Sequence, residues 1–196
     1  MYSSYDPRMD TRQRIVDLVA SNPGQMTCLE YITIAEELEA RGPCSLLVFG
    51  LGKDTPLWSD LNQNGKTIFL EGDARWIAKM RTAAIDVHWV EYTTKLEQAE
   101  ELKKREGIPM LLPSQVRQRV WDVILVDAPP GEAPGRPGRF QSIYEASRLA
   151  APDACVFVHD IDRPVEKWFS TRFLGKPIET VHRLGVFGTR AKQPRR

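Results

Sequence analysis

Five short hydrophobic runs, each ending in glycine or in a polar residue, constrain the fold of this chain most strongly. The first runs from Leu46 to Phe49 and ends in Gly50-Leu51-Gly52, a sequence that lets a ligand approach the backbone closely. The other four end at Glu71, at Glu91, at Asp127 and at His159-Asp160. Because the carboxyl ends of parallel strands meet at the edge of an open α/β sheet where ligands bind, we expect these groups to collect there.

Strand and helix signals alternate along most of the chain. A helix after Thr27 is marked by a capping box with Glu30 and ends at Gly42-Pro43, and an earlier helix covers residues 15–19. Strands are predicted at 45–50, 66–71, 86–92, 121–127 and 154–159, helices at 55–61, 74–83, 95–105 and 139–150, irregular segments at 106–120 and 128–138, and an antiparallel hairpin within 178–189. The prediction is one α/β domain over residues 1–196. It has a mostly parallel sheet with helices on both faces, an N-terminal helical cap over 1–43 and a frayed tail over 190–196.

Composition excludes several classes of protein. The chain has 196 residues, 42% hydrophobic and 27% charged, with a net charge of +1, which is typical of a globular domain and gives no broad basic field for nucleic acid or an anionic membrane. The three cysteines show no zinc-site spacing. No signal peptide or membrane-length apolar stretch is visible, so we expect a cytoplasmic protein without a membrane partner. The oligomeric state is not determined by the sequence.

The glycines and the acidic residue at the end of the next run predict a cofactor site. Glu71 follows the Gly50-Leu51-Gly52 turn by about 20 residues, the spacing at which a carboxylate accepts ribose hydroxyls. This suits either a dinucleotide or S-adenosylmethionine. The third glycine of the dinucleotide fingerprint is missing, which disfavours an NAD-linked enzyme. The predicted cofactor residues are Gly50, Gly52, Asp54, Glu71 and Asp73.

Two later runs end in groups that can move a proton or bind a metal. Asp127 follows Val123–Val126, and His159-Asp160 follows Cys155–Val158. We predict Asp127, His159 and Asp160 as catalytic residues, with one acting as a general base or all three as ligands of a divalent metal. The alternative is that Asp127 caps a turn and His159 bonds to backbone. Because cationic side chains bind carboxylates, the predicted substrate-binding residues for an acidic acceptor are Arg139, Arg163 and Lys53.

Five segments in fixed order match the pattern of a known family. They are Val48-Phe49-Gly50-Leu51-Gly52-x-Asp54, Trp58-x-x-Leu61-Asn62-x-Asn64-Gly65-Lys66-Thr67-Ile68-Phe69-Leu70-Glu71, Trp121-Asp122-Val123-Ile124-Leu125-Val126-Asp127-Ala128-Pro129, Pro137-Gly138-Arg139-x-x-x-Ile143-Tyr144 and Val156-Phe157-Val158-His159-Asp160-x-x-Arg163-x-Val165-Glu166. From about Gln25 to about Gly188 the chain resembles the plant polysaccharide-biosynthesis family that includes glucuronoxylan 4-O-methyltransferase.

The resemblance implies a class I methyltransferase fold, S-adenosylmethionine as donor, and methyl transfer to O4 of a glucuronic acid, with a divalent metal as a further candidate. It assigns Gly50, Gly52 and Glu71 to the cofactor, and Asp127, His159, Asp160 and Arg163 to the transfer site. The family usually has His-Asp-Ser where this chain has Lys53-Asp54-Thr55, and Glu-Glu-Asp where it has Glu71-Gly72-Asp73.

The plant proteins look membrane-anchored, and this chain shows no anchor. We therefore expect a soluble, bacterial relative that O-methylates a uronic acid or another small hydroxylated acceptor. The alternatives are a non-catalytic relative that serves as a binding or scaffold subunit, and a different enzyme that uses S-adenosylmethionine.

Overall fold

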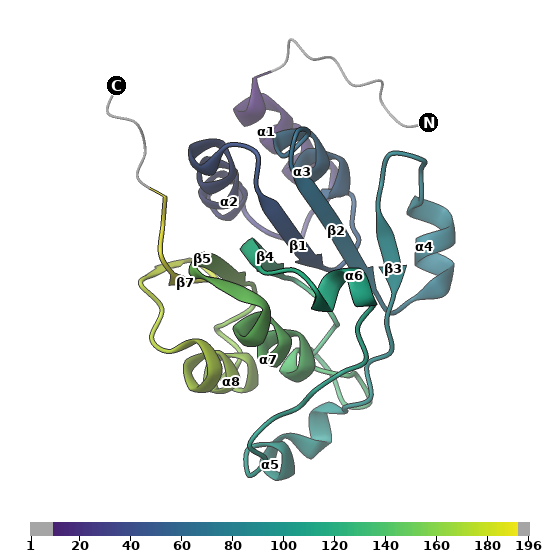
Figure 1. Cartoon of the computed structure of the whole chain (residues 1–196), viewed down its shortest axis with the longest axis vertical. Coiled ribbons are helices and arrows are strands. Elements are labelled where there is room, and N and C mark those ends of the chain that lie inside the picture. The colour runs from purple at the N-terminus through teal and green to yellow at the C-terminus, as the bar shows by residue number, and fades with distance from the viewer. Residues whose placement is uncertain (1–9, 192–196) are drawn as a thin grey trace.

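A single seven-stranded sheet organises the computed structural model, which describes residues 10–191 (Figure 1). The strand order is β3-β2-β1-β4-β5-β7-β6. β1 to β5 pair in parallel, while β7 is antiparallel to both β5 and β6. The strands are β1 (Ser45–Phe49), β2 (Lys66–Glu71), β3 (Val87–Trp89), β4 (Trp121–Val126), β5 (Ala150–Val158), β6 (Glu179–Val181) and β7 (Leu184–Gly188). The predicted parallel sheet and C-terminal hairpin are confirmed.

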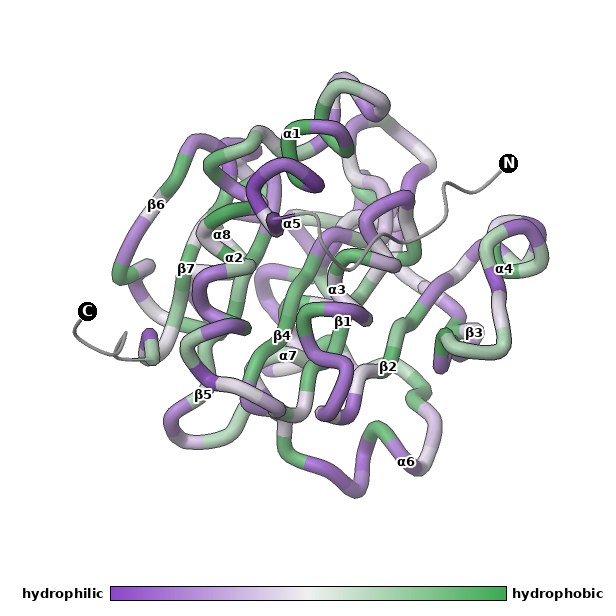
Figure 2. Tube along the Cα trace, turned by 90° about the horizontal axis from the view of Figure 1, so that it is seen from above, coloured by the Kyte–Doolittle hydropathy of each residue, from purple (hydrophilic) through white to green (hydrophobic). Residues whose placement is uncertain are grey.

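Helices cover both faces of the sheet. They are α1 (Thr11–Ser21), α2 (Cys28–Arg41), α3 (Thr55–Leu61), α4 (Ala74–Met80), the 3₁₀ turn η1 (Leu96–Gln98), α5 (Ala99–Leu102), α6 (Ser114–Arg117), α7 (Phe140–Leu149) and α8 (Pro164–Leu174). In β1, Leu46 and Val48 pack with residues of α1 to α4, whereas Leu47 and Phe49 pack with residues of α5 to α8. This alternation explains the continuous apolar run, because a strand buried on both faces has no polar side. Figure 2 shows the hydrophobic strands in the middle of the molecule.

The two N-terminal helices form as the sequence predicts. Thr27 caps α2: its hydroxyl accepts from the Glu30 N–H, and the Glu30 carboxylate accepts from the Thr27 N–H in return. Ile15 of α1 and Ile34 of α2 are fully buried against the sheet. These helices therefore complete one face of the core.

Several boundaries differ from the prediction. The segment 106–120 contains α6, the predicted helix 95–105 divides into η1 and α5, and β5 begins at Ala150 instead of residue 154. Helix α8 was not predicted, although Pro164 starts it, Phe169 is fully buried and Gly175 follows its end.

The first two residues of the predicted frayed tail have partners in the structure. The Arg190 guanidinium pairs with Glu37 at 2.9 Å, and the Ala191 N–H donates to the same carboxylate at 3.0 Å. Residues 192–196 of that tail, and residues 1–9 of the predicted N-terminal cap, lie outside the described residues.

The strand order reverses direction between β1 and β4. In open α/β sheets, ligands bind at such a point, outside the carboxyl ends of the strands. Gly50, Glu71, Asp127 and His159 all lie at this edge. Across residues 10–191, no helix combines the length and the apolar character needed to span a bilayer.

Candidate functional site

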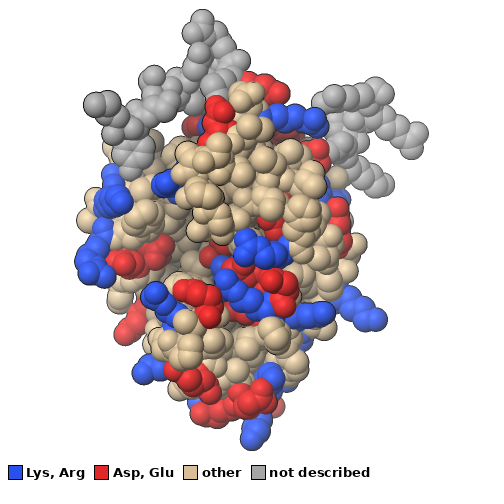
Figure 3. Space-filling view, turned by 180° about the vertical axis from the view of Figure 1, so that it is seen from behind, with Lys and Arg blue, Asp and Glu red and all other residues tan. Residues whose placement is uncertain are grey.

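A cleft of about 560 Å³ opens at the carboxyl edge of β1, β2, β4 and β5. This volume lies within the usual range for small-molecule sites. On the side seen in Figure 3, Lys and Arg side chains are mixed with Asp and Glu across the middle of the face, so charge is balanced locally. The cleft is lined by Asn22, Gly24, Gln25, Tyr31, Val48, Gly50, Leu51, Gly52, Lys53, Asp54, Glu71, Trp76, Leu125, Asp127, Ala128, Pro130, Glu132, Arg139, His159, Asp160, Arg163 and Arg183.

The turn after β1 contributes space to this cleft. Gly50 has φ 126°, a conformation that a side chain disfavours, and a Cβ there would lie 3.3 Å from the Ala128 Cβ. The N–H groups of the turn already have partners: Gly50 donates to the Leu70 carbonyl, Leu51 to Glu71, and Gly52 to the Thr55 hydroxyl. The glycines therefore bring the ends of β1 and β4 together and leave room for a ligand, but they do not offer free backbone donors.

Glu71 is held rigidly at the end of β2. Its Oε1 accepts from the N–H groups of Gly72 at 2.7 Å and Asp73 at 2.9 Å, and its Oε2 accepts from Leu51 at 3.1 Å. An ionised carboxylate has about four acceptor positions, so capacity remains, mainly on Oε2. The carboxylate is thus oriented before any ligand arrives.

Asp54 is a second carboxylate in the cleft, and it titrates unusually. Burial, together with the negative charge of Asp127, raises the pKa of Asp54 to about 6, against the opposing effect of a 3.0 Å hydrogen bond from the Trp58 indole N–H. A bound cation beside Asp54 would favour its ionised form.

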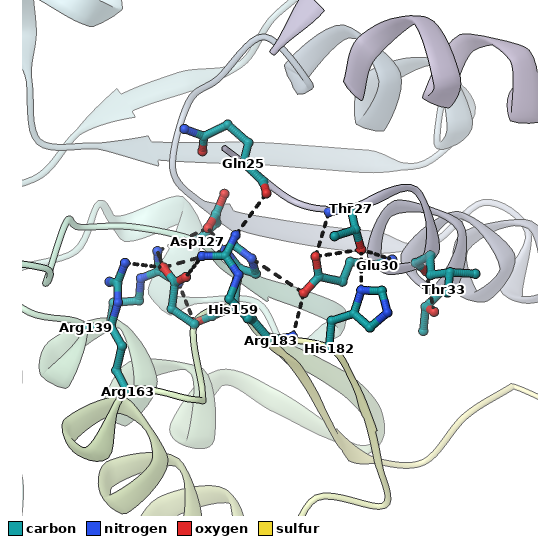
Figure 4. A network of polar contacts seen from close by, with 12 residues as sticks. Gln25, Thr27, Glu30, Thr33, Asp127, Arg139, His159, Arg163, His182 and Arg183 are labelled. Carbon is teal, nitrogen blue, oxygen red and sulfur yellow. Dashed lines mark hydrogen bonds and ion pairs between the residues drawn. The ribbon is translucent and has the colours of Figure 1, made fainter. Parts of the chain in front are cut away.

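Asp127 and His159 form a hydrogen-bonded pair across the ends of β4 and β5 (Figure 4). The His159 Nδ1 lies 2.9 Å from Asp127 Oδ1, and the Asp127 side chain is 25% exposed whereas that of His159 is 4% exposed. Burial opposes ionisation of Asp127, but the bond to His159 and the charge of Arg139 outweigh it, so the pKa of this carboxyl lies below its ordinary value. An ionised Asp127 faces the cleft and His159 lies behind it.

Asp160 is the centre of an arginine cluster. Its Oδ2 accepts from Arg139 Nη2 at 2.8 Å and pairs with Arg163 Nη2 at 3.0 Å, while its Oδ1 accepts from Arg183 Nη1 at 2.9 Å. Asp160 has φ 62°, a left-handed conformation that aspartate tolerates better than most residues. Both oxygens of this carboxylate are therefore paired with guanidinium groups.

The predicted metal ligands lie together, but their surroundings do not suit a cation. Ligand atoms of Asp127, His159 and Asp160 fall within 4.8 Å of one another. Both Asp160 oxygens are already bonded to arginine, and Arg139 Nη2 also lies 3.2 Å from Asp127 Oδ1. A divalent ion bound by all three would have to displace guanidinium groups from its own ligands, so the trio as arranged does not fit a metal.

Of the other residues predicted for the site, some line the cleft and others lie outside it. Lys53 lines the cleft with its ammonium bonded to the Ser21 carbonyl. Asp73 caps α4 through the Arg75 and Trp76 N–H groups and is not among the lining residues, and neither is Glu91. Arg139 is 4% exposed, and its guanidinium contacts the carbonyls of Pro129 and His159 as well as the two aspartates.

Four residues that line the cleft, Gln25, Tyr31, Trp76 and Arg183, are not predicted from the sequence. Gln25 and Tyr31 come from the N-terminal segment, Trp76 donates its indole N–H to the Leu51 carbonyl, and Arg183 follows the β6 strand. None of these follows a hydrophobic run that signals a strand end. Their proximity is set by packing between segments that are distant in sequence.

The strand order, the switch-point cleft and the carboxylate at the end of β2 together define a class I methyltransferase fold. A solved structure of the MycE methyltransferase of the mycinamycin biosynthetic pathway, in complex with Mg and SAH, superposes with a TM-score of 0.56 at 10% identity, covering 94% of this chain and 56% of that one. At this identity the likeness concerns the fold alone.

Sequence comparison shows the family to which this chain belongs. The IRX15/IRX15L/GXM family model matches residues 29–109 and 105–187, and the chain belongs to this family. It is 35% identical over 185 residues to glucuronoxylan 4-O-methyltransferase 2 of Arabidopsis thaliana, covering 82% of this chain and 64% of that protein. It is also 35% identical over 206 residues to arabinogalactan O-methyltransferase 2 of the same plant, covering 89% and 71% respectively. Both relatives are plant proteins, so they give no support to the expected bacterial source.

Proposed function

We propose that this chain is an S-adenosylmethionine-dependent O-methyltransferase whose acceptor is a saccharide that carries a carboxylate. The observation that carries the proposal is the hydrogen-bonded pair of Asp127 and His159 in the same cleft as the preoriented carboxylate of Glu71 and the carboxyl group of Asp54. Relatives named as glucuronoxylan and arabinogalactan methyltransferases support a saccharide acceptor.

The proposed cofactor fits the residues of the cleft. When bound, S-adenosylmethionine supplies an activated methyl group on a positively charged sulfur. Glu71 Oε2 accepts one hydrogen bond, from Leu51, and has capacity left for a ribose hydroxyl, while the carboxylates of Asp54 and Asp127 offer negative charge to the cationic part of the molecule. The glycine turn leaves the space that the cofactor needs.

The proposed proton acceptor is Asp127. A sugar hydroxyl is a very weak acid, so its proton must be taken as the new oxygen–methyl bond forms and the sulfur–methyl bond breaks. Asp127 is the member of the pair that faces the cleft, and the His159 N–H stabilises its negative charge. Because its pKa is low, Asp127 is a weak base in the ground state, and proton transfer is expected late in the displacement. No step here involves a metal.

The proposed anchor for the acceptor carboxylate is Arg163. Arg139 is buried and contacts two aspartates and two carbonyls, whereas the Arg163 side chain lines the cleft, is 26% exposed and pairs through its Nη2 with Asp160. The exposed part of a guanidinium can bind a carboxylate. Arg163 therefore has more capacity for an acidic sugar than Arg139.

The test combines cofactor binding with an acceptor comparison. Calorimetry should detect S-adenosylmethionine binding, and methyl transfer should favour glucuronic acid or its oligosaccharides over glucose, which lacks the carboxylate. Arg163→Ala should raise the KM for the uronic acid and leave that for glucose unchanged. Failure to bind the cofactor would count against the whole proposal, and equal use of both sugars would count against its acidic acceptor.

A further inference from the structure

His159 lies between two carboxylates, and the proposed mechanism uses only one of them. Its Nδ1 is bonded to Asp127, while its Nε2 faces Glu30 of α2, whose Oε1 is 3.7 Å away (Figure 4). Nε2 is buried and has no hydrogen-bond partner among the described residues. Buried polar atoms are normally paired, so this orphaned nitrogen next to a carboxylate calls for an explanation.

Glu30 cannot turn away from the ring. Its side chain is fully buried, its Oε2 accepts from the N–H of Thr27 at 2.6 Å and the hydroxyl of Thr27 at 2.9 Å, and its Oε1 accepts from the Arg183 N–H at 2.8 Å. These donors come from the start of α2 and from the turn between β6 and β7. The direction of Oε1 toward His159 is therefore fixed by two distant parts of the chain.

The two oxygens of Glu30 have different partners. Oε2 makes the helix cap with Thr27, which any capping box requires. Oε1 is not needed for the cap and faces Nε2. The 3.7 Å separation exceeds a hydrogen bond by well under 1 Å, and such contacts often tighten only when the reacting complex forms.

We infer that Glu30 is a positioning residue that holds the His159 ring from behind, so that Nδ1 stays directed at Asp127. Asp127, His159 and Glu30 then form a line from the cleft into the protein. The catalytic part of this inference rests on the proposed function, whereas the orientation of the ring does not. With this role for Glu30, helix α2 contributes a residue to the site in addition to covering the sheet.

Glu37 provides a matched control on the same helix. It is also a fully buried carboxylate, and it bonds to Arg41, Arg190 and the Ala191 N–H, away from the cleft. Glu30→Gln and Glu37→Gln each remove one buried negative charge from α2. Only the first removes a charge that faces His159.

The first measurement needs no acceptor. The chain has three histidines, so nitrogen NMR of labelled histidine can follow each ring. Because a neutral ring has one N–H and cannot donate to both carboxylates, we expect the wild-type His159 to carry an N–H on each ring nitrogen, with the one on Nε2 protected from solvent. Glu30→Gln should shift the His159 ring signals, and Glu37→Gln should leave them in place, with His88, which bonds to Asp86, as the internal reference. An unprotected Nε2 in the wild type, or equal spectra in both variants, would overturn the inference, and the wild-type result stands even if Glu30→Gln does not fold.

The second measurement separates orientation from stability. Glu30→Gln should lower kcat by about tenfold, less than the 10²–10⁴-fold expected for losing the base itself. The acceptor KM and the affinity for S-adenosylmethionine should stay unchanged, and Glu37→Gln should keep wild-type kcat. A wild-type kcat in Glu30→Gln would refute the positioning role. Absence of cofactor binding in the wild type would instead refute the proposed function, while the histidine spectra would still decide the orientation of the ring.

Discussion

The pKa of Asp54 predicts how cofactor affinity depends on pH. Burial and the neighbouring charge of Asp127 raise this pKa to about 6, so the free protein carries a protonated Asp54 below that pH and an ionised one above it. S-adenosylmethionine is cationic at its sulfur and its amino group. If that charge lies against Asp54, binding favours the ionised carboxylate and must release a proton at low pH.

The magnitude follows from the fraction ionised. With a pKa of about 6, roughly one tenth of the protein has an ionised Asp54 at pH 5, so affinity should fall about tenfold between pH 7.5 and pH 5. This corresponds to about 1.4 kcal/mol of binding free energy. Proton release should be measurable near pH 5 and should vanish at pH 7.5, where Asp54 is already ionised.

Titration calorimetry in two buffers with different ionisation enthalpies measures both quantities. Asp54→Asn should bind more weakly at pH 7.5 and lose the pH dependence. Asp60→Asn is the control, because Asp60 lies on α3, the helix that directly follows Asp54, pairs with Arg14 and is not among the lining residues of the cleft. Wild-type affinity that is constant from pH 5 to pH 7.5 without proton release, or an unchanged pH dependence in Asp54→Asn, would refute the reasoning.

Three further outcomes are expected. Glu71→Gln should weaken S-adenosylmethionine binding by roughly tenfold or more in calorimetry, because hydrogen bonds to a charged group contribute about 1.5–3 kcal/mol; equal affinity would remove Glu71 from the cofactor site. Asp127→Asn and His159→Ala should each lower turnover by about 10²–10⁴-fold with cofactor affinity nearly intact, and a variant with wild-type turnover would have no chemical role. Turnover should survive treatment with a chelator, since arginines pair with both carboxylates among the candidate metal ligands, Asp127 and Asp160; a loss that added divalent ion restores would show that these contacts open in the working enzyme.

Much of the fold could be predicted because its signals are local. The capping box at Thr27, the buried runs of β1, β4 and β5, and the helix after Thr55 depend on residues within a few positions of one another. Helix α8 also carried a local signal, with Pro164 at its start and Gly175 after its end. The short helices around residues 95–117 carry no such local signal, because helices of this length are too short to be stabilised by the helix propensity of their residues alone.

In the candidate site, too, one part could be predicted from local sequence signals and another could not. The hydrophobic runs identify the side chains that end the strands, and a parallel sheet places the last residues of its strands at one edge. This brought Gly50, Glu71, Asp127 and His159 to the cleft.

The hydrogen-bond partners of those groups follow from tertiary packing. Asp160 pairs with three arginines, the guanidinium of Arg139 and the N–H groups of the glycine turn have partners, and Glu30 lies behind His159. These contacts join residues from separate elements, and Glu30 is 129 positions before His159 in the chain. Contacts of this kind depend on how helices and strands pack in three dimensions, which no spacing along the chain encodes.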